Sequence, residues 1–368
     1  MTICSMSRMF RAALFGLLSV SGAITLSGLA SAQEAVAHFG AGEDRATSRF
    51  VIHGSTDVGP FTPILEGFSA RYPSVSLRYE QRSTNDIFEL ADRACTEGRA
   101  SADLLISSSI DQQFKLVNDG CAQSHQSAFT DKAPDWATWR NEIFGLTREL
   151  AVIIYNRELM PPDSVPSSRF DLIDLLRRPG GRFQGRVATY DIEQAGVGYL
   201  FAFADSQAAT TYGRLIEAFG RNDVYEACCS AEIIDGVAEG RFLLAYNMLG
   251  SYALARAASD PRIGIVAPDD YTLVLSRAAL VPRGAGAPDM AKAFIDYALS
   301  GEGRQFLKEA GLIVSKTDGA AMAATSKAGL KSAFRPIAFT PSLLVGLDRL
   351  KKRQFLKDWR SGVRGASN

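Results

Sequence analysis

Residues 50–57, Phe-Val-Ile-His-Gly-Ser-Thr-Asp, hold the pattern that decides the fold. The apolar run 50–52 is typical of a buried strand, and the polar residues 53–57 indicate a turn. Apolar residues then recur at helical spacing over 58–72, which predicts a helix that ends before a proline. The stretch therefore reads as a strand, a polar turn and a helix.

Two more units of the same kind follow. Strands are predicted at 75–79 and 102–106, each leading through a Ser-rich turn into a helix. Three such units in a row favour a parallel, doubly wound sheet, in which ligands bind at the carboxyl ends of the strands. The candidate ligand-binding residues in these turns are Ser55, Thr56, Ser83, Thr84, Ser107 and Ser108. Simple capping of the helix starts is the alternative, because Ser and Thr are preferred there without any ligand.

The rest of the chain predicts a second α/β region and a helical end. Strands are expected at 150–155, 187–190, 242–246, 263–266 and 273–275, and helices at 207–220, 288–299, 303–310 and 342–358. Residues 33–48 are polar and are expected to be frayed. The basic segment 343–359 is expected to pack on the domain with its charges in water; a membrane-surface helix is the alternative.

The N-terminus has the pattern of a secretory signal peptide. Arg8 and Arg11 precede an apolar run from 12 to 29, and the small residues 30–32 form a cleavage site before Gln33. We therefore expect residues 1–32 to be removed and the protein to work in the periplasm. A lipid anchor is not expected, because the cleavage site has no cysteine.

Composition argues against several function classes. The chain has 40 basic and 40 acidic residues, so its net charge gives no bias towards nucleic acid or anionic membranes. It has three histidines and lacks the nucleophile-elbow, zinc, phosphate-loop and dinucleotide motifs. We therefore expect no enzyme activity, no cofactor and no metal site, with a secreted enzyme on the same scaffold as an alternative.

Four cysteines follow the predicted cleavage site. Export permits disulfides, and Cys95 with Cys121 is the preferred pair, although buried thiols remain an open alternative. Cys228 and Cys229 are adjacent, and a disulfide between neighbours is strained and rare. None of these spacings is typical of a metal site.

Several stretches give the chain a resemblance to a known family. Besides the strand–Gly-Ser-Thr–helix opening, they are ADLLISS (102–108), AVIIYNR (151–157), DYTLVLSRAALV (270–281) and AFIDYALSGEGRQFL (293–307). With the signal peptide, these stretches resemble bacterial periplasmic solute-binding proteins of ABC transporters, in the branch of ferric-iron and phosphoglycerate-regulatory binding proteins. The resemblance covers about residues 45–325.

This resemblance implies an α/β, two-lobed periplasmic-binding-protein fold of type II. Each lobe would be a mixed sheet flanked by helices, and a small solute would bind in the cleft between the lobes. Lobe 1 would comprise 48–147 and 265–325, lobe 2 would comprise 148–264, and helices within 326–368 would pack on both. The protein would be a monomer that delivers its solute to an inner-membrane ABC permease or reports it to a sensor kinase.

The resemblance also suggests site residues near the crossings and in the second lobe. They are Thr147, Arg148, Gln194, Ala195, Gly196, Val197, Tyr246 and Asn247, with less defined roles for Tyr271 and Arg277. Iron-binding relatives use two adjacent tyrosines, and here only Tyr246 matches, because Asn247 stands at the second position. Fe³⁺ prefers anionic oxygen ligands. An anionic carboxylate or phosphorylated solute is therefore the favoured ligand, and ferric iron held by Tyr246 is the alternative.

Overall fold

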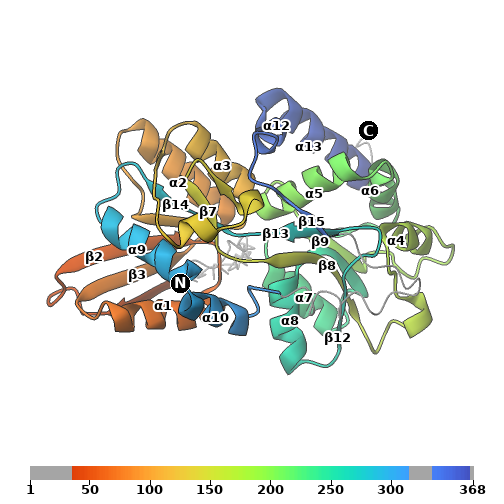
Figure 1. Cartoon of the computed structure of the whole chain (residues 1–368). Helices are drawn as coiled ribbons and strands as arrows, with labels where there is room; N and C mark the ends of the chain where they lie inside the picture. Colours follow the sequence, from red (N-terminus) through yellow and green to blue (C-terminus); the bar gives the residue numbers. More distant parts are fainter. Residues whose placement is uncertain (1–34, 315–333, 365–368) are drawn as a thin grey trace, which may run out of the picture. The chain divides into compact units, whose positions relative to one another are not determined.

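The computed structural model describes residues 35–314 and 334–364, so the predicted signal peptide lies outside the described residues. The described chain forms two mixed sheets with helices packed on them (Figure 1). Within these ranges no helix is both long enough and apolar enough to cross a membrane.

The first sheet has the strand order β1-β3-β2-β4-β14-β7-β6, with β5 paired to β14. Strand β2 is parallel to both β3 and β4, which confirms the three predicted strand–turn–helix units. Its strands are β1 (Ala35–Gly40), β2 (Ser48–Gly54), β3 (Val75–Gln81), β4 (Leu104–Ser107), β5 (Ala122–Gln123), β6 (Thr138–Trp139), β7 (Ile143–Gly145) and β14 (Ala278–Pro282). The associated helices are α1 (Val58–Arg71), α2 (Thr84–Thr96), α3 (Ile110–Asn118), α9 (Pro288–Leu299) and α10 (Gly301–Glu309).

The expectation that residues 33–48 are frayed is wrong for β1. This strand pairs antiparallel with β3 along its whole length, from Ala35 opposite Gln81 to Gly40 opposite Ser76. Its side chains alternate between half-buried and exposed. An edge strand held mainly by main-chain hydrogen bonds needs no apolar run, and that is why the sequence pattern missed it.

The second sheet has the order β10-β9-β11-β8-β13-β15, with β12 paired to β8. Strands β9, β10 and β11 run parallel to one another. The strands are β8 (Glu149–Asn156), β9 (Val187–Tyr190), β10 (Tyr225–Ala227), β11 (Leu244–Leu249), β12 (Ile263–Val266), β13 (Thr272–Leu275) and β15 (Phe334–Pro336). The helices are α4 (Arg169–Leu176), α5 (Gly196–Ala208), α6 (Tyr212–Arg221), α7 (Ser230–Ala238) and α8 (Gly250–Ser259). The helix predicted at 207–220 is thus mainly α6, and α5 ends where it was expected to begin.

The chain passes between the sheets twice within residues 35–314. It leaves the first sheet after Gly145 and enters the second at Glu149. It returns between Leu275 and Ala278, because β13 still pairs with β8 whereas β14 pairs with β4. The predicted lobe boundaries remain a prediction, and this pairing puts β12 and β13 with the second sheet.

The C-terminal helices contact both halves of the structure. Helix α12 (Leu343–Leu347) packs on α3, and α13 (Arg349–Val363) packs on α6 (Figure 1). The Tyr199 hydroxyl on α5 also donates a hydrogen bond to the Gly346 carbonyl (2.5 Å). Trp359 and Val363 are buried among the side chains of the second sheet's helices. The basic α13 therefore packs on the protein through its apolar side.

Two disulfides are present. Cys95 at the end of α2 is bonded to Cys121 beyond α3, which is the preferred pairing. Cys228 and Cys229 are also bonded to each other, and such a disulfide between neighbouring residues is rare. Three short 3-10 helices complete the described fold: η1 (Thr130–Lys132), η2 (Asp135–Ala137) and η3 (Pro162–Ser164).

Candidate functional site

The carboxyl ends of the parallel strands in the two sheets face each other. In the first sheet, β2, β3 and β4 lead into the N-termini of α1, α2 and α3. In the second sheet, β9, β10 and β11 lead into α5, α7 and α8. We call the six strand-to-helix turns the rim. Each helix start presents N–H groups that have no partner within the helix itself, and the positive end of a helix dipole.

The starts of α2 and α5 touch across the rim. The Thr84 hydroxyl accepts a hydrogen bond from the Gly196 amide (2.9 Å), and Asn85 donates to the carbonyls of Glu193 (3.1 Å) and Gln194 (2.9 Å). A β-carbon on Gly196 would lie 2.7 Å from the Ser109 hydroxyl oxygen. Glycine here allows the close approach of the two halves, because a β-carbon would crowd side-chain oxygens of the first half.

A second contact joins α1 to α8. The Asp57 amide donates to the Tyr252 hydroxyl (3.1 Å), and the Asp57 carboxylate accepts from Gln81 (2.9 Å). Burial raises the pKa of Asp57 above its usual range, against the opposing effect of the nearby Arg277. The rim therefore contains a carboxylate whose ionised form is disfavoured by burial.

A buried ion pair lies beneath this contact. Glu149 begins β8 and Arg277 precedes β14, both are fully buried, and their side chains are joined by two hydrogen bonds of 2.8 and 3.2 Å. Glu149 also accepts from the hydroxyls of Thr147 (2.8 Å) and Ser251. Burial alone would lower the pKa of Arg277, but Glu149 raises it above the ordinary value. This arginine is neutralised by its own partner and holds the two halves together.

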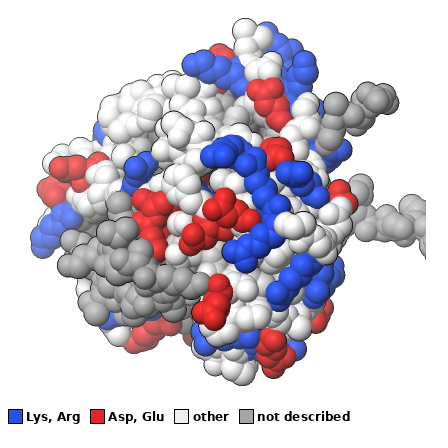
Figure 2. Space-filling view, turned by 90° about the vertical axis from the view of Figure 1, so that its right-hand side faces the viewer, with Lys and Arg blue, Asp and Glu red and all other residues white. Residues whose placement is uncertain are grey.

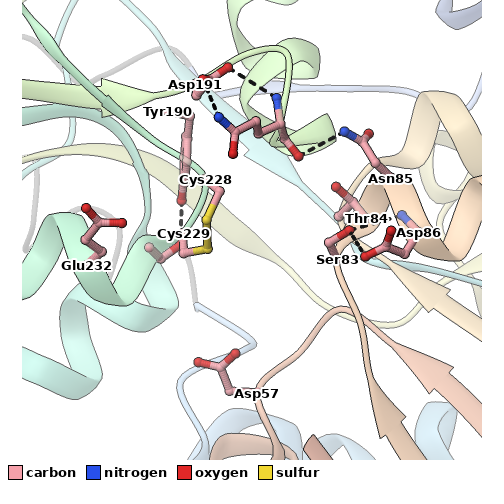
Figure 3. Close-up of a disulfide and its surroundings, with 12 residues drawn as sticks. Asp57, Ser83, Thr84, Asn85, Asp86, Tyr190, Asp191, Cys228, Cys229 and Glu232 are labelled. Atoms are coloured by element: carbon pink, nitrogen blue, oxygen red, sulfur yellow. Dashed lines mark hydrogen bonds between the residues drawn. A yellow bond between two sulfur atoms is a disulfide. The ribbon is translucent and has the colours of Figure 1, made fainter. Parts of the chain in front are cut away.

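The turn after β10 carries the adjacent disulfide. Cys229 is the residue that precedes α7, and the next residue, Ser230, shares a hydrogen bond of 2.6 Å with the Tyr190 hydroxyl. Figure 3 shows the disulfide beside Tyr190, with Asp57 and Ser83 of the first sheet drawn across from it. This turn is part of the rim.

Most of the predicted polar turn residues lie on the rim. The Ser55 hydroxyl oxygen accepts from the Ser108 amide (3.0 Å), and Ser83 caps α2 by accepting from the Asp86 amide (3.0 Å). Thr56 is fully buried and its hydroxyl has no hydrogen-bond partner within the described ranges. The predicted residues brought together on the rim are Ser55, Thr56, Ser83, Thr84, Ser107, Ser108, Gln194, Ala195, Gly196 and Val197.

Thr147 and Arg148 lie away from the rim surface. The Thr147 hydroxyl accepts a hydrogen bond from the Arg277 amide (2.8 Å) and so lies beside the buried ion pair. The Arg148 guanidinium donates to the Val314 carbonyl (2.5 Å) and lies 5.4 Å from the ring centre of Phe334. Burial lowers its pKa. The structure thus directs Arg148 towards the chain's later segments.

The expectation that Tyr246 and Asn247 face a cleft is corrected by the structure. Tyr246 is 3% exposed, and its hydroxyl donates to the Asp205 carboxylate (2.7 Å). Asn247 donates to the same carboxylate (2.7 Å), as does Tyr271 (2.7 Å), and Arg169 pairs with it at 3.0 Å. We call these five residues the Asp205 cluster.

The cluster makes Tyr246 a poor metal ligand. Burial raises the pKa of Tyr246 well above its usual value, against the attraction of Arg169, so the neutral phenol is favoured. A tyrosine must lose its proton to bind Fe³⁺ strongly. Among the described residues no group of three or more His, Cys, Asp or Glu side chains could hold a metal ion.

Sequence reasoning missed several rim residues. Asp57 closes the Gly-Ser-Thr-Asp turn and Cys228-Cys229 is visible as a dipeptide, so both had a local signal. Tyr190 and Tyr252 had no local signal, because the pattern around each predicts only an ordinary buried aromatic residue. Their placement depends on contacts between segments far apart in the chain.

Comparison with known proteins assigns the chain to a family. The family model described as bacterial extracellular solute-binding protein matches residues 51–313. The chain belongs to this family. The family is one of solute-binding proteins of ABC transporters, as the sequence resemblance implied. A comparison with curated proteins gives no match.

Solved structures agree with this assignment to the solute-binding family. The substrate-binding protein of an ABC transporter from Agrobacterium tumefaciens is 35% identical, with a TM-score of 0.82, 90% of this chain covered and 99% of that chain. AfuA from Actinobacillus pleuropneumoniae, with fructose-6-phosphate bound, is 17% identical, with a TM-score of 0.69 and coverages of 87% and 100%. The ferric binding protein from Campylobacter jejuni is 16% identical, with a TM-score of 0.63 and coverages of 85% and 99%. These neighbours confirm the predicted two-lobed type II fold.

Proposed function

We propose that this solute-binding protein captures a small anionic solute, a carboxylate or a phosphorylated compound, at the rim between its two sheets. The observation that carries the proposal is that helix N-termini from the two sheets come together, α2 with α5 and α1 with α8. Helix starts favour anions because their N–H groups and dipoles point at the ligand. The hydroxyls of Ser55 and Ser108, which lie 3.3 Å apart, add polar groups to the rim.

The charge distribution is consistent with a small anion rather than a polyanion. Arg277 is neutralised by Glu149, so the attraction at the rim comes from helix ends and hydroxyls. On the face displayed in Figure 2, a band of basic side chains lies beside a group of acidic side chains, so neither sign covers the whole face. A polyanion such as nucleic acid would need a basic surface.

We infer that the solute is handed to an inner-membrane ABC permease or reported to a sensor kinase. Membership of an ABC transporter's solute-binding family supports the first partner. The predicted signal peptide at residues 1–32 supports a periplasmic location, and a monomer is the expected form. The similar proteins of known structure are binding proteins, which supports binding rather than catalysis as the activity.

Ferric iron is the second candidate solute, because ferric-binding proteins share the fold. The burial of Tyr246 in the Asp205 cluster weighs against it. Ferric citrate added to the purified protein would produce a visible tyrosinate-to-iron absorption band if iron were the solute. We expect no such band.

The test of the anion proposal is a thermal-shift screen with inorganic phosphate, hexose phosphates, dicarboxylates and neutral sugars. A solute at about 100 times its Kd should add about 2.7 kcal/mol of stability. We expect shifts with anions, and shifts with neutral sugars alone would overturn the proposal.

A matched pair of variants sharpens this screen. Ser83 and Ser300 both cap helices, α2 at the rim and α10 away from it, by accepting from the amides of Asp86 (3.0 Å) and Gly303 (3.2 Å). Each Ser→Ala change should cost about 1 kcal/mol of stability. Only Ser83→Ala should weaken anion binding, and equal binding by both variants would contradict a site at the rim.

A further inference from the structure

The Cys228–Cys229 disulfide contributes little to the stability of the fold as a cross-link. A disulfide stabilises a fold mainly by closing a loop of the unfolded chain, and its effect grows with loop length. Cys228 and Cys229 are adjacent, so their bond closes no loop of other residues. The Cys95–Cys121 bond, by contrast, spans a sequence separation of 26.

The sulfur atoms also take no part in the apolar core of the second sheet. Both cysteines are half-buried, and neither belongs to the described hydrophobic clusters, whereas Cys95 and Cys121 pack in one. The adjacent disulfide therefore presents sulfur surface outside the core, at the end of β10.

The position of this surface is fixed from both sides of the turn. Strand β10 pairs with β9 up to Ala227 opposite Tyr190, and Ser230 is held by the Tyr190 hydroxyl (2.6 Å). Across from the disulfide, Figure 3 shows the polar side chains of Asp57 and Ser83. Figure 3 also draws Asp191 and Glu232 on the disulfide's own side, so the disulfide is a patch of sulfur surface among polar side chains.

We propose that the Cys228–Cys229 disulfide is an apolar contact surface for the solute, which is therefore an anion carrying a ring or another flat apolar face. This inference rests on the proposed function. Disulfide sulfur offers no hydrogen-bond donor and is at most a weak acceptor, but it is polarisable and packs well against carbon. A bare anion gains nothing from such a patch, whereas a ring gains contact area.

The covalent bond between neighbours adds rigidity to this patch. A turn locked before the solute arrives loses less conformational freedom on binding, and affinity gains from that saving. The disulfide therefore discriminates between solutes by their shape while the helix starts attract their charge.

Three probes separate these two contributions: inorganic phosphate, glucose 6-phosphate and phenyl phosphate. Calorimetric titration of the oxidised wild-type protein should show at least one ring-bearing phosphate binding about tenfold or more tighter than inorganic phosphate, the size expected of a small apolar contact. The two ring probes distinguish a sugar-like ring from an aromatic one.

The variant Cys228→Ser/Cys229→Ser removes the sulfur patch while keeping similar volume. It should lose most of the preference for the ring and keep its affinity for inorganic phosphate within a few-fold. Reducing the folded wild-type protein with a phosphine should act in the same direction. The control Cys95→Ser/Cys121→Ser should keep the preference although it is less stable.

The outcomes are distinguishable. Equal binding of all three probes by wild-type protein, or a preference unchanged in the Cys228→Ser/Cys229→Ser variant, overturns this inference and leaves the anion site standing. Failure of all three probes, with neutral sugars binding instead, overturns the proposed function and this inference with it.

Discussion

The hydroxyl of Thr84 accepts a hydrogen bond of 2.9 Å from the amide of Gly196, and this bond joins the start of α2 to the start of α5. One residue comes from the first sheet's half of the molecule and the other from the second. The two rim halves therefore meet at a position where a side chain on residue 196 would crowd the hydroxyls of Thr84 and Ser109.

Gly196→Ala should separate the rim halves. Its β-carbon would lie 2.7 Å from the Ser109 hydroxyl oxygen and 2.8 Å from that of Thr84, both closer than normal contact. We expect about tenfold weaker solute binding, or about 1.4 kcal/mol, and a larger radius of gyration by small-angle X-ray scattering. Gly213→Ala is the control, because its β-carbon meets nothing within 4 Å. Identical scattering and affinity for both variants would count against the contact.

Asp57→Asn should strengthen anion binding at pH 7. The change removes a negative charge from the rim and keeps an oxygen that accepts from Gln81. Burial raises the pKa of Asp57, with Gln81, Tyr252 and Arg277 facing it, so wild-type affinity should rise as pH falls towards that raised pKa. Titration calorimetry across pH should show this rise in wild-type protein and a flatter profile in Asp57→Asn. A variant that binds anions more weakly at pH 7 would argue against electrostatic repulsion by Asp57.

Acid should destabilise the first sheet through His53 and Glu80. Burial lowers the pKa of His53 to about 4, against the attraction of Glu80, 3.2 Å away. The unfolded chain binds the His53 proton more readily, so stability is lost as pH falls from about 6.5 towards 4, by up to about 3 kcal/mol. Burial alone would raise the pKa of Glu80, but the hydrogen bond from Arg82 lowers it. The stability that the Glu80 carboxylate contributes is therefore also lost as pH falls.

Urea unfolding as a function of pH measures this effect. His53→Gln should reduce the slope of stability between pH 6.5 and 4, while His125→Gln is the control at a less buried His–Asp pair. If stability depends on pH equally in wild-type protein and in His53→Gln, other groups must cause the sensitivity to acid.

Tyr246→Phe should lower stability without weakening solute binding. The variant leaves the buried Asp205 carboxylate with one hydrogen bond fewer, at a cost of about 1–3 kcal/mol. Tyr155→Phe on the neighbouring strand removes a hydroxyl outside the Asp205 cluster and should cost less. Thermal unfolding and calorimetric titration report the two quantities separately. Loss of solute binding with unchanged stability would instead indicate that Tyr246 belongs to the binding site.

The two disulfides should differ in their effect on stability. Replacing Cys95 and Cys121 by Ala releases a loop with a sequence separation of 26 and should cost about 3 kcal/mol. The same replacement at Cys228 and Cys229 opens no loop and should cost clearly less. Denaturant unfolding of the two double variants compares them directly, and a reversed order would contradict the loop argument.

Local patterns predicted the three strand-to-helix turns of the first sheet well. The turns at Ser55, Ser83 and Ser108 follow strands that alternate or run apolar, and each begins a helix, so short-range spacing was enough. The edge strand β1 was missed because it is held by pairing rather than by burial. The predicted placement of Tyr246 failed for a backbone reason: β11 shifts register between Ala245 and Met248, and Asn247 has a φ of 58°.

The contacts that join the two sheets could not be predicted from local patterns. Glu149 with Arg277, and Asp57 with Tyr252, are separated by more than a hundred residues, and no single segment signals its partner. The Asp205 cluster has the same character, because its members come from four separate segments. Polar side chains in apolar surroundings were visible in the sequence, but their pairing is a property of the folded chain.

The C-terminal helices have a mechanical consequence. Helix α12 packs on α3 and accepts a hydrogen bond from Tyr199 of α5, while α13 packs on α6, so the end of the chain spans the junction between the halves outside the two crossings. The two crossings within residues 35–314 are the segments about which the halves would turn. A contact between the halves that lies away from these crossings restricts how far the halves can turn apart. We therefore expect the anchoring of α12 and α13 to limit how far the two halves separate when the solute enters.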